Sequence, residues 1–386
     1  MAGMVRPGLI ASAAAIGLAA TLTLQAVVSA TCQVAVAPRQ DRPNIVVVIF
    51  DDLEVPLARA LPGWRELEER GTTFDRAVVT SPLCCPSRVS TLTGKYAHNH
   101  GVIWNAIPNG GHKRALEMGV ERCTVALWLQ QAGYTTALMG KYLNGYGYET
   151  PASNIPAGWD QWAALWKGTG VVGGSYLLNV DGRLERPAGY QTDELASRAV
   201  RFMSHAESAG TPFFMYLAPA PPHRPWIPPA RYASADTGTY ELPERYRTML
   251  AGIDLVQRVL EAAPENTYLI LTSDNGYHLR PTPGKAEPRW VDVNVPFVVI
   301  GPSVAIEGRD ELVANIDLAP TIADWAGITP PLGVDGSSFV PLLAGDPRGW
   351  RDEILTEMVG SWRAFVTRTE MRIHWAAGGD DVIDLR

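Results

Sequence analysis

The sequence predicts an α/β fold whose central sheet is mostly parallel. Short, continuous apolar runs recur along the chain, and unbroken apolarity is typical of strands that are covered on both faces. Amphipathic segments typical of helices lie between these runs. Strands that alternate with helices favour a parallel sheet sandwiched between layers of helices.

Five apolar runs are the predicted strands of this sheet. They span residues 44–50, 134–140, 212–219, 267–273 and 296–300. Because each run is apolar throughout, we expect both of its faces to be buried in the core of the sandwich.

Helical patterns occupy the intervals between the strands. They span residues 62–71, 123–133, 192–208 and 246–263. The first two end at a glycine and the third opens at Thr192, which are common stop and start signals of helices. A further short helix is predicted after the first strand, because Pro86 suits the first helical position and Gly94 suits the residue just past the end.

The pattern changes after residue 310. A helix is predicted over residues 315–328, entered through Asp317 and Pro320. Short segments typical of strands follow at residues 353–360, 362–368, 372–378 and 381–385. We therefore expect a main α/β domain over residues 41–310 and a small antiparallel C-terminal subdomain over residues 311–386.

The N-terminal segment has the features of a secretory signal peptide. Arg6 precedes an uncharged, apolar run from Leu9 to Ala30, which ends in the small-residue pattern Val28-Ser29-Ala30. We expect residues 1–30 to be cleaved and the protein to be secreted or otherwise extracytoplasmic. An uncleaved membrane anchor is the alternative, because a run of about 20 apolar residues can span a bilayer.

Composition and charge disfavour several classes of function. Hydrophobic residues make up 46% of the 386-residue chain, which is enough for a large core. The formal net charge is −7 without a long run of either sign. Nucleic acid is therefore not an expected partner, because phosphate contacts need a clustered basic surface. We also expect no stable membrane partner.

The four cysteines are too few and too scattered for a disulfide scaffold. They are Cys32, Cys84, Cys85 and Cys123, and no spacing among them resembles a zinc site. Adjacent cysteines rarely pair with each other, because the ring would be strained. Export would permit other disulfides, and the sequence leaves their pairing open.

Polar residues follow four of the predicted strands directly or within a short loop. They are Asp51, Asp52, Lys141, His223, Asp274 and Asn275. Sites in open α/β sheets form at the carboxyl ends of strands, so we expect these side chains to meet at one edge. Each alone could be an ordinary surface turn, but their agreement favours a function. The carboxylate and amide oxygens form a set that suits a hard divalent cation.

The predicted helix at residues 86–94 places Cys84 and Cys85 at its N-terminus. Free N–H groups and partial positive charge make that end a natural anion site, and Arg88 adds a planar cation suited to oxyanions. We expect a thiol at this position to be acidified and nucleophilic. The alternative is an ordinary short helix with a buried cysteine.

The sequence C-x-P-S-R followed by TLTGKY resembles the signature of the type I sulfatases. Further stretches match in the family's order: NIVVVIFDDLE, SPLCCPSRVSTLTGKYAHNHGV, GKYLNGYG, APPHRPW, TSDNGYHL, NIDLAPTIADWAGI and VDGSSFVPLL. The resemblance covers nearly the whole chain beyond the N-terminal segment. It implies an alkaline-phosphatase-like sandwich.

In that family the first cysteine of C-x-P-x-R is oxidised to formylglycine by a maturation enzyme. Only Cys84 has Pro86 and Arg88 at the required offsets, so Cys85 is the variable residue of the motif. The resemblance implies that one hydroxyl of the hydrated aldehyde attacks sulfur, and that loss of a proton from the other then expels sulfate. A serine could perform the first step but has no comparable release step.

The resemblance also implies the roles of the surrounding residues. Calcium, or more rarely magnesium, is expected at Asp51, Asp52, Asp274 and Asn275, together with the modified Cys84. Lys141 and Lys285 are expected to contact sulfate, His223 to donate a proton to the bridging oxygen, and Arg88 to stabilise the hydrate. Many members carry a histidine where Leu143 stands, so the base that releases sulfate is open, with His278 or a neighbouring aspartate as candidates.

Four further residues are expected near the substrate: His98, His100, Asn144 and His278. For His98 and His100 an ordinary role as loop polar groups is the alternative. The motifs GKYLN, CCPSR and KYAHNH resemble the N-acetylglucosamine-6-sulfatase branch of the family. The expected activity is hydrolysis of a sulfate monoester of a small substrate, such as a 6-O-sulfated amino sugar. The alternatives are a phosphonate monoester or phosphodiester hydrolase and a catalytically impaired, sulfatase-like binding protein.

Overall fold

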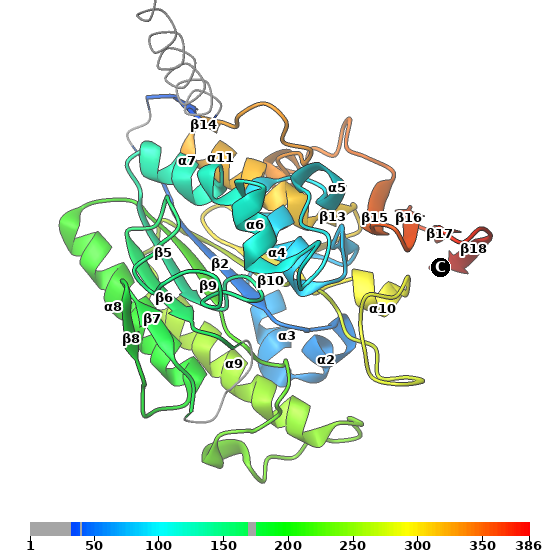
Figure 1. Ribbon diagram of the computed structural model, residues 1–386, viewed down its shortest axis with the longest axis horizontal. Helices are drawn as coiled ribbons and strands as arrows, with labels where there is room; N and C mark the ends of the chain where they lie inside the picture. Colours follow the sequence, from blue (N-terminus) through cyan, green and yellow to red (C-terminus); the bar gives the residue numbers. More distant parts are fainter. Residues whose placement is uncertain (1–31, 39–40, 169–174) are drawn as a thin grey trace, which may run out of the picture.

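The structure is a computed structural model that describes residues 32–38, 41–168 and 175–386. The predicted signal peptide at residues 1–30 lies outside the described residues. The largest sheet of the described chain has ten strands, in the order β12-β3-β11-β10-β2-β9-β5-β6-β7-β8 (Figure 1).

The middle of this sheet is parallel. Its five strands, in sheet order, are β10 (Thr267–Ser273), β2 (Asn44–Phe50), β9 (Phe213–Ala218), β5 (Thr135–Gly140) and β6 (Gln161–Leu165). Four of them were predicted from their apolar runs, and β6 was not. The parallel register brings the carboxyl ends of β2 and β10 to one edge, where Phe50 lies opposite Ser273.

The flanks of the sheet are short and mixed in direction. The predicted strand at residues 296–300 is confirmed as β11 (Val298–Ile300), which runs antiparallel to β10. Beyond it lie β3 (Thr72–Phe74) and β12 (Glu307–Arg309), and beyond β6 lie β7 (Leu178–Val180) and β8 (Arg183–Glu185). These outer strands have no strong apolar pattern and were not predicted.

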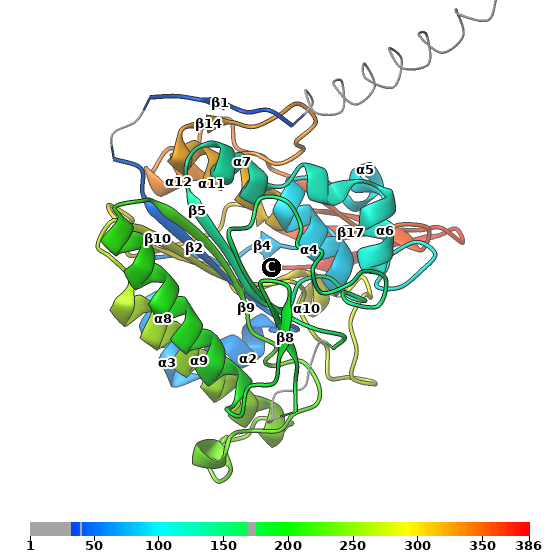
Figure 2. The ribbon, with the colours of Figure 1, turned by 60° about the vertical axis from the view of Figure 1, so that its left-hand side comes forward.

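Helices cover both faces of the sheet (Figure 2). One face carries α2 (Val55–Ala60), α3 (Pro62–Glu68), α8 (Gln191–Ala209) and α9 (Pro243–Ala262). The other carries α4 (Cys84–Thr93), α7 (Val125–Gln131) and α11 (Leu318–Ala326). The continuous apolarity of β2 follows, because Val46, Val48 and Phe50 pack into one core while its other apolar residues pack into the opposite one.

Smaller elements complete the main body. The remaining helices are α5 (Ala97–His100), α6 (Gly111–Glu117), α10 (Trp290–Val293) and α12 (Val340–Leu343), with single 3₁₀ turns at Val120–Arg122, Ala230–Tyr232 and Asn315–Asp317. Two short strand pairs join β1 (Ala35–Val36) to β14 (Ile328–Thr329) and β4 (Ala77–Val78) to β13 (Val313–Ala314).

The C-terminal strands form a separate antiparallel sheet, as predicted. It consists of β15 (Ile354–Met358), β16 (Trp362–Val366), β17 (Glu370–Trp375) and β18 (Asp380–Asp384) in chain order. Its buried face shares a core with Val78 and Leu83, in the segment that leads to Cys84. The boundary at residues 310 and 311 stays a prediction; α11 packs with α4 and α7 in the main body.

A disulfide joins Cys32 to Cys123, with 5.4 Å between the two Cα atoms. The bond ties the first described residues to the segment before α7. The sequence had left this pairing open, and Cys84 and Cys85 are both free and buried. Among the described residues, no helix combines the length and apolarity that a membrane crossing requires.

Candidate active site

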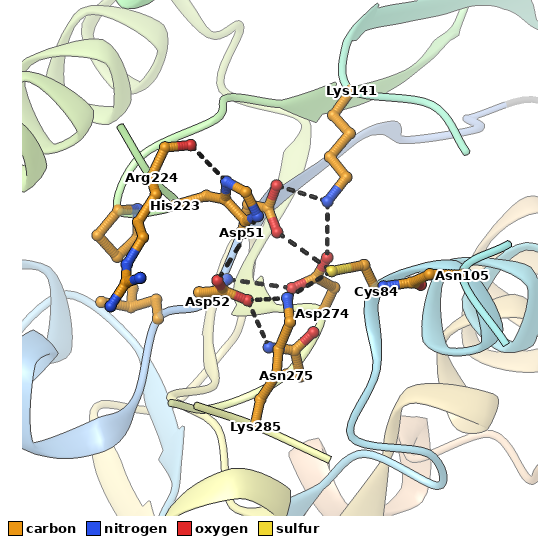
Figure 3. Close-up of polar contacts among 12 residues, drawn as sticks. Asp51, Asp52, Cys84, Asn105, Lys141, His223, Arg224, Asp274, Asn275 and Lys285 are labelled. Atoms are coloured by element: carbon orange, nitrogen blue, oxygen red, sulfur yellow. Dashed lines mark hydrogen bonds and ion pairs between the residues drawn. The ribbon is translucent and has the colours of Figure 1, made fainter. Parts of the chain in front are cut away.

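The polar residues predicted at the strand ends meet at one edge of the sheet (Figure 3). Asp51 and Asp52 follow β2, Lys141 follows β5, and Asp274 and Asn275 follow β10. Cys84 enters the same cluster as the first residue of α4. Lys285 reaches it from the loop after β10, and His223 from the loop after β9. Segments far apart in sequence therefore supply one compact group of charges.

Four residues of this cluster could hold a divalent cation. Asp51, Asp52, Cys84 and Asp274 each offer one ligand atom, and these atoms lie within 4.8 Å of one another. The side chain of Asn275 donates to Asp52 Oδ1 over 2.7 Å, while its buried Oδ1 has no hydrogen-bond partner in the described chain. Three carboxylates and an unpartnered amide oxygen fit a hard ion such as calcium.

Three cations interleave with these carboxylates. Lys141 Nζ lies 2.5 Å from Asp51 Oδ2, and Arg88 Nε donates to Asp274 Oδ2 over 2.8 Å. Lys285 Nζ contacts Asp52 Oδ1 and lies 2.6 Å from Cys84 Sγ. Removal of a single member would leave an opposite charge buried without its nearest partner, which is costly.

The neighbouring cations lower the pKa of the Asp51 carboxyl group. Burial by itself raises the pKa of this carboxyl group, but the neighbouring cations, Lys141 first among them, outweigh burial and lower the pKa below its usual value. For Lys141, burial lowers the pKa of the ammonium group, and the Asp51 carboxylate outweighs it and raises the pKa. The two groups therefore keep each other charged.

The thiol of Cys84 behaves differently from the expectation. Burial raises its pKa to about 11, although Lys141 and Lys285 lie close enough to oppose the shift. The expected acidification at the helix N-terminus is therefore wrong, because loss of solvation outweighs the favourable charges. An unmodified thiol here is protonated at neutral pH, with Asp51 Oδ1 as its hydrogen-bond acceptor at 3.6 Å.

The N-terminus of α4 is held by the side chain of Asn105. The Cys85 N–H donates to Asn105 Oδ1 over 2.8 Å, so a side chain from a separate loop caps the first turn. The helix begins at Cys84, two residues before the predicted start at Pro86. Further into the helix, the buried Arg88 also donates to the Lys141 carbonyl over 3.1 Å.

His223 presents one ring nitrogen to the cluster. Its Nδ1 lies 2.6 Å from the Arg224 carbonyl, which can only accept, so Nδ1 carries a proton. Its Nε2 lies 3.9 Å from Asp52 Oδ2 (Figure 3). The ring is a quarter exposed, which leaves Nε2 able to meet both the cluster and a ligand.

His278 lies in the loop that carries Lys285. Its Nδ1 is 2.8 Å from Asp292 Oδ1, and its backbone exchanges two hydrogen bonds of 2.9 Å with Gly284. The ring is buried, so this arrangement anchors both ends of the turn just before Lys285. Contact of His278 with substrate stays a prediction.

The other expected substrate residues lie around α4 and β5. His98 Nδ1 is 2.5 Å from the buried Glu357 of β15, which joins α5 to the C-terminal sheet. His100 is buried against the flank of α4, with Nε2 3.1 Å from Ser90 Oγ. Asn144 accepts the His112 N–H through its carbonyl over 2.7 Å. Contact of these three residues with substrate is likewise still a prediction.

Sequence reasoning missed a buried group behind the cluster. Arg245, on the first turn of α9, donates to the Asp52 carbonyl and pairs with Glu54. In the sequence Arg245 is an ordinary helix residue, and nothing in its local pattern places it beside β2. Only the tertiary packing of α9 on the sheet reveals it.

Comparison with known proteins agrees with this arrangement. The profile of the family described as Sulfatase matches residues 43–328, and the profile described as N-sulphoglucosamine sulphohydrolase, C-terminal, matches residues 291–370. The chain is 32% identical over 379 residues to the N-acetylglucosamine-6-sulfatase of Capra hircus, covering 83% of this chain and 67% of that protein. It is 30% identical over 383 residues to an extracellular sulfatase homologue of Drosophila melanogaster, covering 83% and 33% of the two chains.

Solved structures share the fold. A protein solved in complex with its substrate D-glucosamine-2-N,6-O-disulfate superposes with a TM-score of 0.75 at 21% identity, covering 89% of this chain and 91% of that chain. A phosphonate monoester hydrolase from Silicibacter pomeroyi superposes with a TM-score of 0.67 at 21% identity, covering 89% of each chain. The predicted alkaline-phosphatase-like architecture is confirmed.

Proposed function

The chain belongs to the type I sulfatase family, and we propose that it hydrolyses the 6-O-sulfate ester of an amino sugar through a formylglycine at residue 84 and a bound calcium ion. The observation that carries the proposal is the meeting of Cys84 with three buried carboxylates and two lysines at the carboxyl edge of the sheet. This is the charge pattern that a sulfate ester and a divalent cation together require.

The lysines account for binding of the sulfate group. Lys141 and Lys285 approach the cluster from separate segments and lie near Cys84. Their ammonium groups would hold sulfate oxygens and offset the repulsion that three carboxylates exert on an anion. A bound calcium ion would supply further positive charge at the sulfate and at residue 84.

Residue 84 and Asp51 account for attack on sulfur. An aldehyde hydrate at residue 84 would supply one hydroxyl as the nucleophile, and loss of the proton from its second hydroxyl would expel sulfate and restore the aldehyde. Asp51 Oδ1 already accepts a hydrogen bond from Cys84 Sγ, so this carboxylate is placed to take a proton from the group at residue 84. A buried Leu143 stands at the position where many family members carry a histidine.

His223 accounts for departure of the alcohol. With Nδ1–H donated to the Arg224 carbonyl, Nε2 must also carry a proton to act as an acid, so the acting form is the imidazolium. Its Nε2 lies 3.9 Å from Asp52 Oδ2, so this nitrogen faces the carboxylate cluster. As the S–O bond breaks, Nε2–H gives its proton to the leaving sugar oxygen.

The substrate class and location rest on the relatives and on composition. The N-acetylglucosamine-6-sulfatase of Capra hircus supports a sulfated amino sugar. A net charge of −7 favours a small, singly sulfated ligand over a densely sulfated polymer. The apolar N-terminal run, the disulfide and an extracellular relative together support secretion.

The proposal is tested by expressing the protein together with a maturation enzyme and measuring the mass of the peptide that spans residues 77–88. Mass spectrometry should show that Cys84 has lost its sulfur and gained an aldehyde oxygen while Cys85 is unchanged. Cys84→Ala should abolish turnover of an aryl sulfate, and Cys85→Ala, the matched control, should retain most of it. Active protein with an unmodified Cys84 would contradict the proposal.

Substrate preference distinguishes the proposed sulfatase activity from the alternative, phosphonate monoester hydrolysis. The likeness to a phosphonate monoester hydrolase favours testing an aryl phosphonate beside the aryl sulfate. A sulfatase should show the larger kcat/KM on the sulfate, and the reverse order would assign the chain to phosphonate hydrolysis.

A further inference from the structure

Asp52 has an unusual backbone conformation. Its φ angle is +70°, in the left-handed region that residues other than glycine rarely adopt. Such a conformation is strained and persists only where the surrounding structure holds it. Because Asp52 lies directly after β2 among the carboxylates of the site, this conformation directs its side chain toward Asn275 and Lys285.

Hydrogen bonds hold the backbone of Asp52 on both sides. Its N–H donates to Asp274 Oδ1 over 3.2 Å. Its carbonyl accepts from Nη2 of Arg245, which reaches it from α9. The first contact comes from within the carboxylate cluster, and the second comes from behind it.

The guanidinium of Arg245 is itself fixed by buried partners. Nη1 lies 2.5 Å from Glu54 Oε1, and the hydroxyl of Tyr240 donates to the same carboxylate over 2.7 Å. The guanidinium carbon lies 4.8 Å from the centre of the Tyr277 ring. Arg245 is fully buried and Glu54 is 2% exposed, so neither is available to bind a substrate.

We propose that Arg245 and Glu54 are positioning residues that hold the Asp52 carboxylate in the orientation required by the divalent cation. The inference rests on the proposed calcium site. The observation that supports it is the hydrogen bond from Arg245 to the main-chain carbonyl of Asp52, a proposed metal ligand. Arg245 does not contact the Asp52 carboxylate, so it can act on that ligand only through the backbone. Loss of Arg245 would release the strained backbone while leaving every candidate ligand in the chain.

The energetics of a buried ion pair determine which variants can test this role. Burial of two charges costs about as much as their attraction returns, so replacement of both partners by apolar residues is often neutral for stability. Removal of one partner alone is destabilising, because it leaves an uncompensated charge. The pair should therefore be removed as a unit to separate positioning from stability.

The double variant Glu54→Leu/Arg245→Met makes that separation. Wild type and variant are stripped of metal with a chelator, calcium affinity is measured by isothermal titration calorimetry, and thermal melting in chelator reports stability. We expect the metal-free melting temperatures to be similar and the calcium affinity of the variant to fall about 10–100-fold, the usual effect of losing a group that orients a metal ligand. Saturating calcium should restore much of kcat.

Two further variants sharpen the test. Glu194→Leu/Arg198→Met removes the ion pair between Glu194 and Arg198 on α8, and it should leave calcium affinity unchanged. Arg245→Lys keeps a charge beside Glu54, but a single ammonium group cannot reproduce the forked contact to Glu54 and the Asp52 carbonyl. It should therefore weaken calcium binding while the protein stays folded.

The outcomes distinguish this inference from the proposed function. Wild type that binds no calcium would overturn the proposed metal site. Wild type that binds calcium, with the Glu54→Leu/Arg245→Met variant folded and binding equally well, would overturn the positioning role alone. A double variant that is unfolded in chelator while wild type is folded would assign the pair to stability and also overturn the inference.

Discussion

Asp51 contacts two functional candidates of the site through its two carboxylate oxygens. One carboxylate oxygen accepts from Cys84 and the other pairs with Lys141, so this side chain links the proposed nucleophile position to the lysine that we propose binds sulfate. We expect Asp51→Ala to reduce kcat/KM on an aryl sulfate to near background. The variant should also lose calcium, which elemental analysis of the purified protein would detect. It should melt at a lower temperature because the buried Lys141 loses its nearest carboxylate and keeps only Asp274, at 3.8 Å.

His223 offers a comparison within the same prediction. In the proposed mechanism it contributes a proton transfer and not a cation ligand, so His223→Ala should lower the rate by about 10²–10⁴-fold and retain calcium. An Asp51→Ala enzyme that keeps both its metal and its activity, or a His223→Ala enzyme more impaired than Asp51→Ala, would contradict these assignments.

Burial of the neutral His100 ring should make the stability of the protein depend on pH. Burial, with smaller effects of Lys95 and His98, lowers its pKa to about 3, and Nδ1 must be unprotonated because it accepts from the Val102 N–H. The folded state therefore binds fewer protons than the unfolded state between pH 6.5 and pH 3. The free energy of unfolding should fall as the pH drops through this range, by about 2 kcal/mol at pH 5 from this residue.

The variant His100→Asn measures the contribution of this one side chain. An amide oxygen can still accept from the Val102 N–H but does not titrate. Chemical denaturation at pH 7 and pH 5 should show a smaller loss of stability in His100→Asn than in wild type. Equal losses in the two proteins would show that His100 is protonated in the folded state or does not control the acid response.

Sequence reasoning at the residue scale succeeded where chemistry follows from residue type and position. Asp51, Asp52 and Asp274 were recognisable because they follow apolar runs, and their convergence follows from the parallel register. The ionisation of Cys84 was not predictable, because it depends on how completely other segments bury the thiol. Arg245 was missed for the same reason, since its contact to Asp52 exists only in the packed structure.

At the scale of elements, two backbone hydrogen bonds between His278 and Gly284 close the turn directly before Lys285. His278 joins this turn to Asp292 at the start of the next helix, α10. We expect His278→Ala to loosen the turn and to lower kcat/KM by about 10–100-fold. A displacement of a positioned group by about 1 Å is enough for a loss of this size. The exposed His205 of α8, replaced by alanine, is the matched control and should have no effect.

A double-mutant cycle with Lys285→Ala shows whether His278 acts through Lys285. If it does, adding His278→Ala to Lys285→Ala should cost far less than it costs in wild type. Fully additive losses would mean that His278 contributes on its own, for example by contact with substrate as the sequence predicts.

The elements that could be predicted were long and continuously apolar. The four central strands β2, β5, β9 and β10 matched their runs closely, because burial on both faces leaves an unbroken pattern. Strands of three residues, such as β3 and β12, are too short for any periodicity and depend on their neighbours for pairing. The antiparallel direction of β11 was also unreadable, since an apolar run carries no information on direction.

At the scale of the whole molecule, two regions far apart in sequence meet around the site. The C-terminal sheet contacts α5 through the pair of His98 and Glu357, and it shares a core with the segment before Cys84. The carboxyl edge of the central sheet supplies the charges of the cluster. The order of the motifs predicted the fold and the meeting of charges at the sheet edge. It did not predict the contact of the C-terminal sheet with α5, and it does not predict which sugar the site accepts.

The identity of the sugar is tested by a panel of substrates at equal concentration: glucosamine 6-sulfate, galactose 6-sulfate, choline sulfate and an aryl sulfate. A primary sulfate on the flexible C6 arm can reach a nucleophile that is buried, as residue 84 is, while the ring stays outside. We therefore expect glucosamine 6-sulfate to give the largest kcat/KM among the alkyl esters. With an overall charge of −7, a substrate that carries one sulfate meets less long-range repulsion than a polysulfated chain, so added salt should change its KM little. Efficient turnover of the aryl ester with both sugars inert would refute the amino-sugar assignment and leave the broader sulfatase activity standing.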